Sequence, residues 1–175
     1  MLFMRAVLFT ILVPGTVAGY LPYIIAQRWP DQFDFGIVQH IGLLLITAGV
    51  LLYGMSTFLF LTEGKGTPAI WFTKPLRAVL GEEPQTLVLN GLYQRTRNPM
   101  YLGVIVLVLG EAFWFGKKIL LPYTVFLWVF FHFIIILVEE PHLRHLYGTE
   151  YETYSRTVPQ WIGFRKRSDE KGHET

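Results

Sequence analysis

At 175 residues the chain has the length of a single domain. Of its residues 52% are apolar or aromatic, and its mean hydropathy of +0.39 is unusually positive for a soluble domain of this size. It contains no cysteine, which excludes disulfides, thiolate zinc sites, iron–sulfur clusters and a cysteine nucleophile. The formal net charge of +2 is too small to indicate binding to nucleic acid. The composition therefore points to a protein that resides in a lipid bilayer.

Four segments are apolar and close to the length of about 20 residues that a membrane crossing needs. They cover about residues 6–25, 36–61, 100–116 and 119–138. The first is interrupted by Pro14, Gly15 and Pro22 and also fits a signal peptide, with Arg5 before it and TVAG as a small-residue cleavage site. Its apolar run continues past that site, which favours an uncleaved helix. We predict an all-α, integral-membrane bundle of about four transmembrane helices, with 1–175 forming one domain.

Positive charge is concentrated in two regions, the loop 62–99 and the tail 139–175. Four spans place these two regions and the N-terminus on one side of the membrane. The excess of Lys and Arg makes that side cytoplasmic. Any chemistry should therefore occur at the cytoplasmic ends of the helices.

The stretch RTRNPMYLG begins the third apolar segment with features of a helix start. Asn98 is a favourable N-cap and Pro99 suits the first helical position, where no N–H is needed. The free N–H groups of that turn, with Arg95 and Arg97, suit a carboxylate or a phosphate. Gly103 leaves room for a ligand or a neighbouring helix. The alternative is a capped helix with topology-setting arginines and a packing glycine.

Gly103 and Gly110 lie seven residues apart on the same predicted helix. Small residues at this spacing form a stripe along which two membrane helices can approach closely.

The stretch VEEPHLRHLYG ends the fourth apolar segment with the acid pair Glu139 and Glu140. Ionisable groups at a membrane boundary are expensive unless they face water or a partner. A carboxylate here could accept two hydrogen bonds from a vicinal diol such as a ribose, or the pair could simply be solvated and paired with Arg144. Glu139 and His142 also form a Glu-x-x-His pair, but a di-metal site needs a second pair and more carboxylates, so we expect no metal.

The tail after the acid pair is amphipathic and rich in aromatic residues. Tyr147, Tyr151 and Tyr154 recur at spacings of four and three and so share one helix face. This pattern predicts a C-terminal interfacial helix, either a membrane-surface anchor or a lid over a site.

The segments GLYQRTRNPMYLG and EEPHLRHLYGTEYETYSRTVPQWI, separated by an apolar stretch, resemble the isoprenylcysteine carboxyl methyltransferase and phospholipid methyltransferase superfamily. The GTP of the cytoplasmic loop resembles the bacterial branch, which implies a bacterial inner membrane. The resemblance implies methyl transfer from S-adenosyl-L-methionine, held at the cytoplasmic helix ends, to a lipophilic acceptor that enters from the bilayer. The cofactor-binding residues it implies are Asn98, Pro99, Met100, Tyr101 and Glu139. We add Gly103 to them because it leaves room for a ligand one turn into the helix.

For the chemistry itself we expect Arg97 to hold the cofactor's carboxylate, with Glu140 and His142 as the nearest general bases if one is needed. Two departures from the family pattern concern the acceptor and the site. Asn98 stands where eukaryotic relatives have histidine, and Ile135 stands where they have an arginine for the substrate carboxylate. Prenylcysteine carboxylate is therefore less favoured than other methyl acceptors. A sterol-reductase-like oxidoreductase and a non-enzymatic membrane scaffold remain as alternatives.

Overall fold

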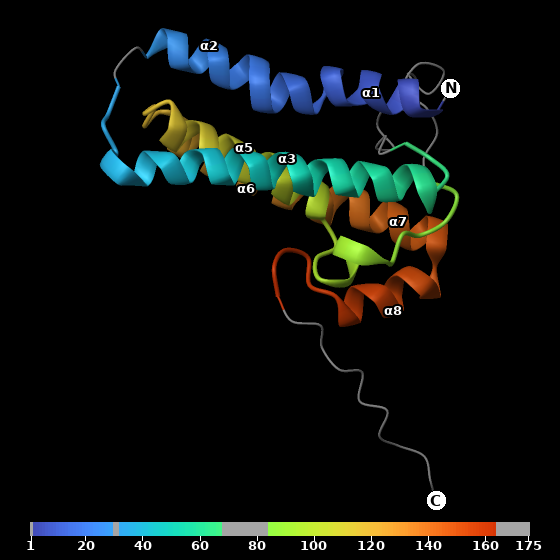
Figure 1. Ribbon diagram of the computed structural model, residues 1–175. Helices are drawn as coiled ribbons and strands as arrows, with labels where there is room; N and C mark the ends of the chain where they lie inside the picture. Colours follow the sequence, from blue (N-terminus) through green and yellow to red (C-terminus); the bar gives the residue numbers. More distant parts are fainter. Residues whose placement is uncertain (1, 30–31, 68–83, 164–175) are drawn as a thin grey trace, which may run out of the picture.

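The computed structural model describes residues 2–29, 32–67 and 84–163, and every regular element in these ranges is helical. The long helices run side by side, and the short helix α8 lies beneath one end of them (Figure 1). The elements are α1 (Leu2–Leu12), η1 (Thr16–Tyr20), α2 (Leu21–Arg28), η2 (Gly36–Val38), α3 (Gln39–Thr62), η4 (Gly91–Gln94), α5 (Pro99–Trp114), α6 (Leu120–Ile134), η5 (Ile135–Glu139), α7 (Glu140–Tyr147) and α8 (Thr149–Thr157).

Within the described residues, three helical stretches are long and apolar enough to cross a membrane: Leu2–Arg28, Gly36–Thr62 and Leu120–Tyr147. The fourth, Pro99–Trp114, is apolar but has only 16 residues. At about 1.5 Å per residue it spans roughly 24 Å, less than the hydrocarbon core of about 30 Å. The predicted all-α membrane bundle of about four helices is confirmed, with α5 as its shortest member.

The first stretch is not broken at its prolines. After Pro14 the chain passes through the π-turn η1 and enters α2, which has Pro22 in its first turn. A proline removes one N–H from the helical ladder, and a wider π-turn keeps the helix continuous around such a defect.

The fourth stretch does not end at residue 138, as the sequence had suggested, but continues to Tyr147. Pro141 lies in the first turn of α7, and the π-turn η5 immediately before it absorbs the lost N–H. The helix stops only at Gly148, whose φ of +53° favours glycine. The acid pair is therefore inside a continuous helix rather than at its end.

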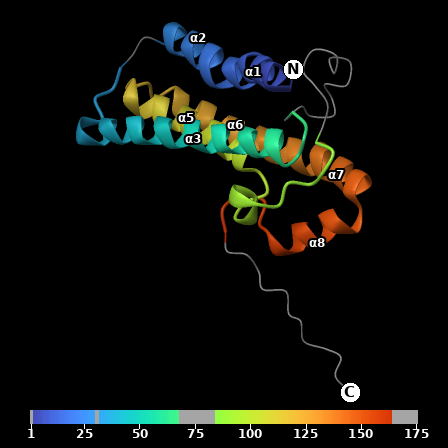
Figure 2. The same ribbon diagram turned by 45° about the vertical axis from the view of Figure 1, so that its right-hand side comes forward.

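Glycines join α3 to α5 at two levels, and the two helices lie side by side in both views (Figures 1 and 2). A Cβ atom on Gly110 would lie 2.7 Å from the carbonyl oxygen of Gly42, and one on Gly103 would lie 2.9 Å from that of Gly49. Gly42 and Gly49 are seven residues apart on α3, and Gly103 and Gly110 are seven residues apart on α5. The predicted small-residue stripe on α5 is thus confirmed, and its partner is a matching stripe on α3.

Replacing Gly49 by alanine should destabilise the bundle by about 1–3 kcal/mol, because over-packing forces the two backbones apart. Its Cβ would lie 2.6 Å from both the Gly103 oxygen and the Leu107 nitrogen. Gly54→Ala on the same helix is the matched control, since a Cβ there meets no atom of the described residues within 4 Å. Thermal unfolding in detergent measures both, and an equal effect of the two substitutions would contradict the close contact.

The C-terminal helix packs by its tyrosine face on the segment that precedes α5. Tyr151 and Tyr154 are buried with Val88, Tyr93 and Val158. The Tyr154 hydroxyl donates to the Tyr93 carbonyl oxygen at 2.8 Å. The aromatic face of α8 is therefore directed at protein and covers the end of the bundle.

The predicted tyrosine face is divided between two helices. Tyr147 belongs to α7, before the turn at Gly148, and its hydroxyl donates to the Pro84 carbonyl oxygen at 2.6 Å. All three tyrosines nevertheless contact the same segment, residues 84–93, because the turn folds α8 back beneath α7 (Figure 1).

Candidate functional site

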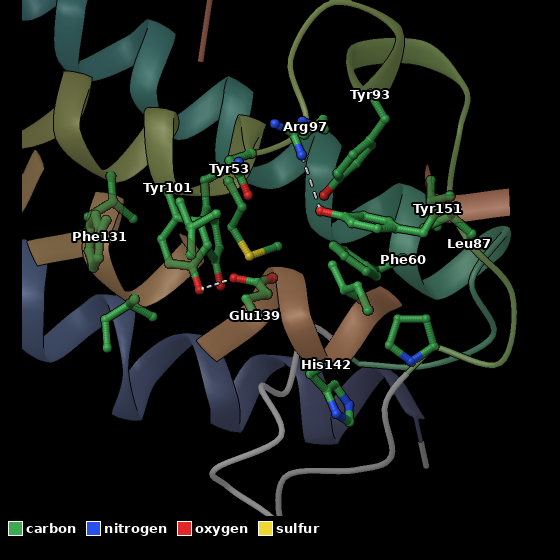
Figure 3. A pocket seen from close by; sticks show the side chains of 18 of the residues that line it. Tyr53, Phe60, Leu87, Tyr93, Arg97, Tyr101, Phe131, Glu139, His142 and Tyr151 are labelled. Atoms are coloured by element: carbon green, nitrogen blue, oxygen red, sulfur yellow. Dashed lines mark hydrogen bonds between the residues drawn. The ribbon is translucent and has the colours of Figure 1, made fainter. Parts of the chain in front are cut away.

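A cavity of about 230 Å³ lies where α1, α3, α5 and the α6–α7 helix come together (Figure 3). One part of its wall carries polar side chains, among them Arg97, Asn98, Tyr101, Glu139 and His142. The other part is apolar and comes from the membrane helices, with Phe9, Val13, Val17, Val104, Phe131 and Ile135. The cavity therefore joins a charged end to a lipophilic one.

Asn98 occupies the N-cap position of α5, but its side chain makes no capping hydrogen bond. The predicted N-cap position is confirmed, but the side-chain hydrogen bond that usually accompanies it is not made. The Asn98 Nδ2 atom instead donates to the carbonyl oxygen of Gln160 at 3.0 Å. The hydrogen bond to this backbone carbonyl orients the Asn98 side chain towards the C-terminal segment instead of the helix start. Pro99 begins the helix as predicted.

The C-terminal segment is joined to this loop by further hydrogen bonds. The Arg97 N–H donates to the Pro159 carbonyl oxygen at 2.9 Å, and the Thr96 hydroxyl donates to that of Gln160 at 3.1 Å. Trp161 holds the other side of the segment, since its indole N–H donates to His132 Nδ1 at 3.3 Å. Residues more than 60 positions apart therefore hold the start of α5 in place.

Arg97 is buried and has a carboxylate partner. Its Nη1 atom lies 2.7 Å from Glu140 Oε1. The same atom lies 3.4 Å from the Tyr151 hydroxyl, a contact that Figure 3 shows. Its Nε atom is buried and has no hydrogen-bond partner in the described structure. An orphaned buried donor at the cavity wall is suited to a ligand acceptor.

Glu140 accepts from Arg97 and, through Oε2, from Arg144 at 3.4 Å. Glu140 is 8% exposed and is not part of the cavity wall, whereas the Arg144 side chain is 55% exposed. The geometry therefore supports a role for Glu140 in holding Arg97 in position. It gives no support to Glu140 as a general base. Burial, helped by the Glu140 charge, raises the pKa of the Tyr151 phenol to about 12, so that Tyr151 stays neutral beside Arg97.

Tyr101 and Glu139 connect the two predicted motifs directly. The Tyr101 hydroxyl donates to Glu139 Oε2 at 2.8 Å, and its ring packs on Phe131 with centroids 4.8 Å apart (Figure 3). No described donor occupies Glu139 Oε1. One carboxylate oxygen thus remains for a ligand hydroxyl or ammonium group.

The remaining predicted site residues divide into two groups. Met100 and His142 line the cavity, with His142 on α7 at its edge (Figure 3). Pro99 is buried beneath the helix start, and Gly103 faces Gly49 and Tyr53 of α3 rather than the cavity. The geometry supports a packing role for Gly103, which was the alternative left open from the sequence.

A family model described as phospholipid methyltransferase matches residues 38–150, from the start of α3 to the start of α8. This chain belongs to the phospholipid methyltransferase family. The superfamily recognised from the two motifs is confirmed, and with the apolar helices it makes the protein a membrane methyltransferase.

Three relatives of this phospholipid methyltransferase family member carry related names. A probable protein-S-isoprenylcysteine O-methyltransferase of Oryza sativa subsp. japonica is 26% identical over 140 residues, covering 79% of this chain and 68% of the relative. Protein-S-isoprenylcysteine O-methyltransferase B of Arabidopsis thaliana is 28% identical over 128 residues, covering 73% and 60%. The enzyme of Schizosaccharomyces pombe is 35% identical over 77 residues, covering 43% and 32%. No solved structure matches the chain.

Sequence reasoning missed the membrane side of this methyltransferase's cavity. Tyr53 of α3 lines it and shares a hydrogen bond of 2.8 Å with the Thr10 hydroxyl of α1. Phe9, Val13 and Val17 of the first stretch also line it. A hydroxyl inside an apolar span was the available signal at Tyr53, but the apolar residues carried none, because a lipid-facing side chain and a cavity-facing one are of the same type.

Proposed function

We propose that this protein transfers a methyl group from S-adenosyl-L-methionine to a lipophilic acceptor at the cytoplasmic face of the membrane. One observation carries the proposal: a single cavity combines the polar groups of both motifs with an apolar wall from membrane helices. Family membership supports the methyl transfer. The excess of Lys and Arg in the 62–99 loop and the tail supports the cytoplasmic placement of the site and of both termini.

The polar end fits the methionine part of this cofactor. Arg97 Nε is a buried donor that has no hydrogen-bond partner in the part of the chain that the structure describes, and a carboxylate would satisfy it. The first turn of α5 adds unsatisfied N–H groups and a partial positive charge. Glu139 Oε1 would accept from a ribose hydroxyl. When bound, S-adenosyl-L-methionine supplies an electrophilic methyl group on a sulfonium.

The chain contributes alignment and exclusion of water rather than acid–base chemistry. Tyr101 is held by Glu139 and Phe131, and Arg97 by Glu140, so the polar wall is rigid before a ligand arrives. The aromatic rings of Tyr93 and Tyr151 lie close to Arg97 in the same wall (Figure 3). Such rings keep water out of the reacting region.

The apolar end fits a lipid acceptor that arrives from the bilayer between the membrane helices. Ile135 lines this part and is 1% exposed. The eukaryotic enzymes that the motifs resemble have an arginine here for a substrate carboxylate. Isoleucine cannot pair with a carboxylate. We therefore propose that the acceptor is a lipid or lipid-modified molecule whose methylated group does not need an arginine at this position.

The purified protein should bind S-adenosylhomocysteine, as measured by isothermal calorimetry in detergent. A lipid extract incubated with the protein and methyl-labelled S-adenosyl-L-methionine should then contain a labelled lipid, identified by mass spectrometry. Binding of reduced nicotinamide adenine dinucleotide phosphate in place of the adenosyl ligand would contradict the proposal and favour a reductase. Binding of neither ligand would favour a scaffold.

A further inference from the structure

The amide of Asn98 has a defined orientation in this structure. Its Nδ2 atom lies 3.0 Å from the carbonyl oxygen of Gln160, which can only accept a hydrogen bond. The end of the amide that faces this oxygen must therefore be the NH₂ group. A carbonyl partner removes the usual ambiguity between the two ends of an asparagine side chain.

The opposite end of the amide, Oδ1, is then the group that Asn98 can offer to a ligand. Asn98 lines the cavity, and no described residue donates to its Oδ1. An amide oxygen accepts hydrogen bonds and cannot donate them. Asn98 therefore cannot bind an anion through this atom, although the sequence had placed it in an anion-receptive turn.

We propose that Asn98 binds the α-ammonium group of the cofactor's methionine part through Oδ1, while the carboxylate of that part is bound by Arg97 and the α5 start. This inference rests on the proposed function. It assigns the two oppositely charged groups of the ligand to two neighbouring residues of the protein. Among the described residues, Arg97 Nε is a donor without a partner and Asn98 Oδ1 an acceptor without one, so the pair is complementary to an amino acid zwitterion.

The C-terminal segment makes this selectivity possible. The Gln160 carbonyl that orients Asn98 also accepts from the Thr96 hydroxyl, and Trp161 next to it is held by His132. The rings of His132 and Trp161 are stacked with centroids 6.5 Å apart. A segment held on both sides keeps its carbonyl, and with it the Asn98 amide, in one orientation.

Three ligands test the inference by calorimetry on the full-length protein in detergent. They are S-adenosylhomocysteine, its des-amino analogue 5′-(3-carboxypropyl)thioadenosine and its decarboxylated analogue 5′-(3-aminopropyl)thioadenosine. Asn98→Leu should weaken the two amino-bearing ligands by about tenfold or more, as expected for a lost hydrogen bond to a charged group. Its affinity for the carboxypropyl analogue should stay within about twofold of the native value.

Asn98→His should retain the native preference for the amino-bearing ligands, because one ring nitrogen can donate to Gln160 while the other accepts. Thr96→Val is the matched control, since it removes the second hydrogen bond to the same carbonyl, together with the acceptor of the Asn98 backbone N–H, without removing a side chain of the cavity wall. It should change the affinity for all three ligands alike.

Two outcomes would overturn the assignment of Asn98. One is a loss in Asn98→Leu confined to the ligands that carry a carboxylate, and the other is an equal loss for all three ligands. If the native protein binds no adenosyl ligand at all, the proposed function fails as well, so the two failures are distinguishable.

Discussion

Replacing Arg97 by alanine should destabilise the protein by about 3–5 kcal/mol, because it leaves a buried carboxylate without its partner. Glu140 is 8% exposed, and its contact with Arg97 is short at 2.7 Å. The remaining contact with Arg144 is longer, at 3.4 Å, and that side chain is 55% exposed, so it compensates little. Chemical denaturation in mixed micelles measures the free energy of unfolding.

Two further variants separate the buried pair from its surroundings. The double substitution Arg97→Met with Glu140→Met removes both charges and should recover most of the lost stability. Arg144→Ala removes only the exposed partner and should cost less than about 1 kcal/mol. If Arg144→Ala were as damaging as Arg97→Ala, Glu140 would belong to the surface pair and its positioning role towards Arg97 would be refuted.

Replacing Glu139 by leucine should weaken the binding of S-adenosylhomocysteine by about tenfold to a hundredfold. The substitution removes the oxygen that we assign to the ligand and leaves the Tyr101 hydroxyl buried without its acceptor. Losing a hydrogen bond between a charged and a neutral group costs about 1.5–3 kcal/mol. At about 1.4 kcal/mol for each factor of ten, this corresponds to the predicted range.

The pair formed by Glu139 and Tyr101 can be tested by a double-mutant cycle. Tyr101→Phe alone should weaken binding less than Glu139→Leu, and the double variant should lose less than the sum of the two, because the residues share one hydrogen bond. Glu150→Gln on the exposed surface of α8 is the charge control and should leave binding unchanged. Additive effects of the two substitutions would mean that Tyr101 and Glu139 act independently.

The helical bundle was predictable because its signals are local. Each span is a run of apolar residues long enough for the bilayer, and α5 begins at Pro99 as its sequence indicates. The stripe of Gly103 and Gly110 was visible as a periodicity. The extension of the last span to Tyr147 was not predictable, because a proline such as Pro141 normally ends a helix. Here the π-turn before Pro141 keeps the helix continuous.

The candidate site was predictable in part. Two motifs separated by an apolar stretch carry Arg97, Asn98, Tyr101, Glu139 and His142, and the structure brings all five to one cavity. The roles of individual residues could not be read in the same way. Gly103 proved to face a helix, and Glu140 proved to face an arginine, although each stands beside a cavity residue in the sequence.

By itself, the sequence determined the class of this protein: a helical membrane methyltransferase whose polar residues gather at one end of the bundle. Only the tertiary structure decided how those polar residues are paired. Arg97 meets Glu140 across 43 residues of chain, and Asn98 meets the Gln160 carbonyl across 62. Apolar periodicity reports which residues avoid water, whereas the partner of a buried polar group depends on which distant segment supplies the complementary donor or acceptor.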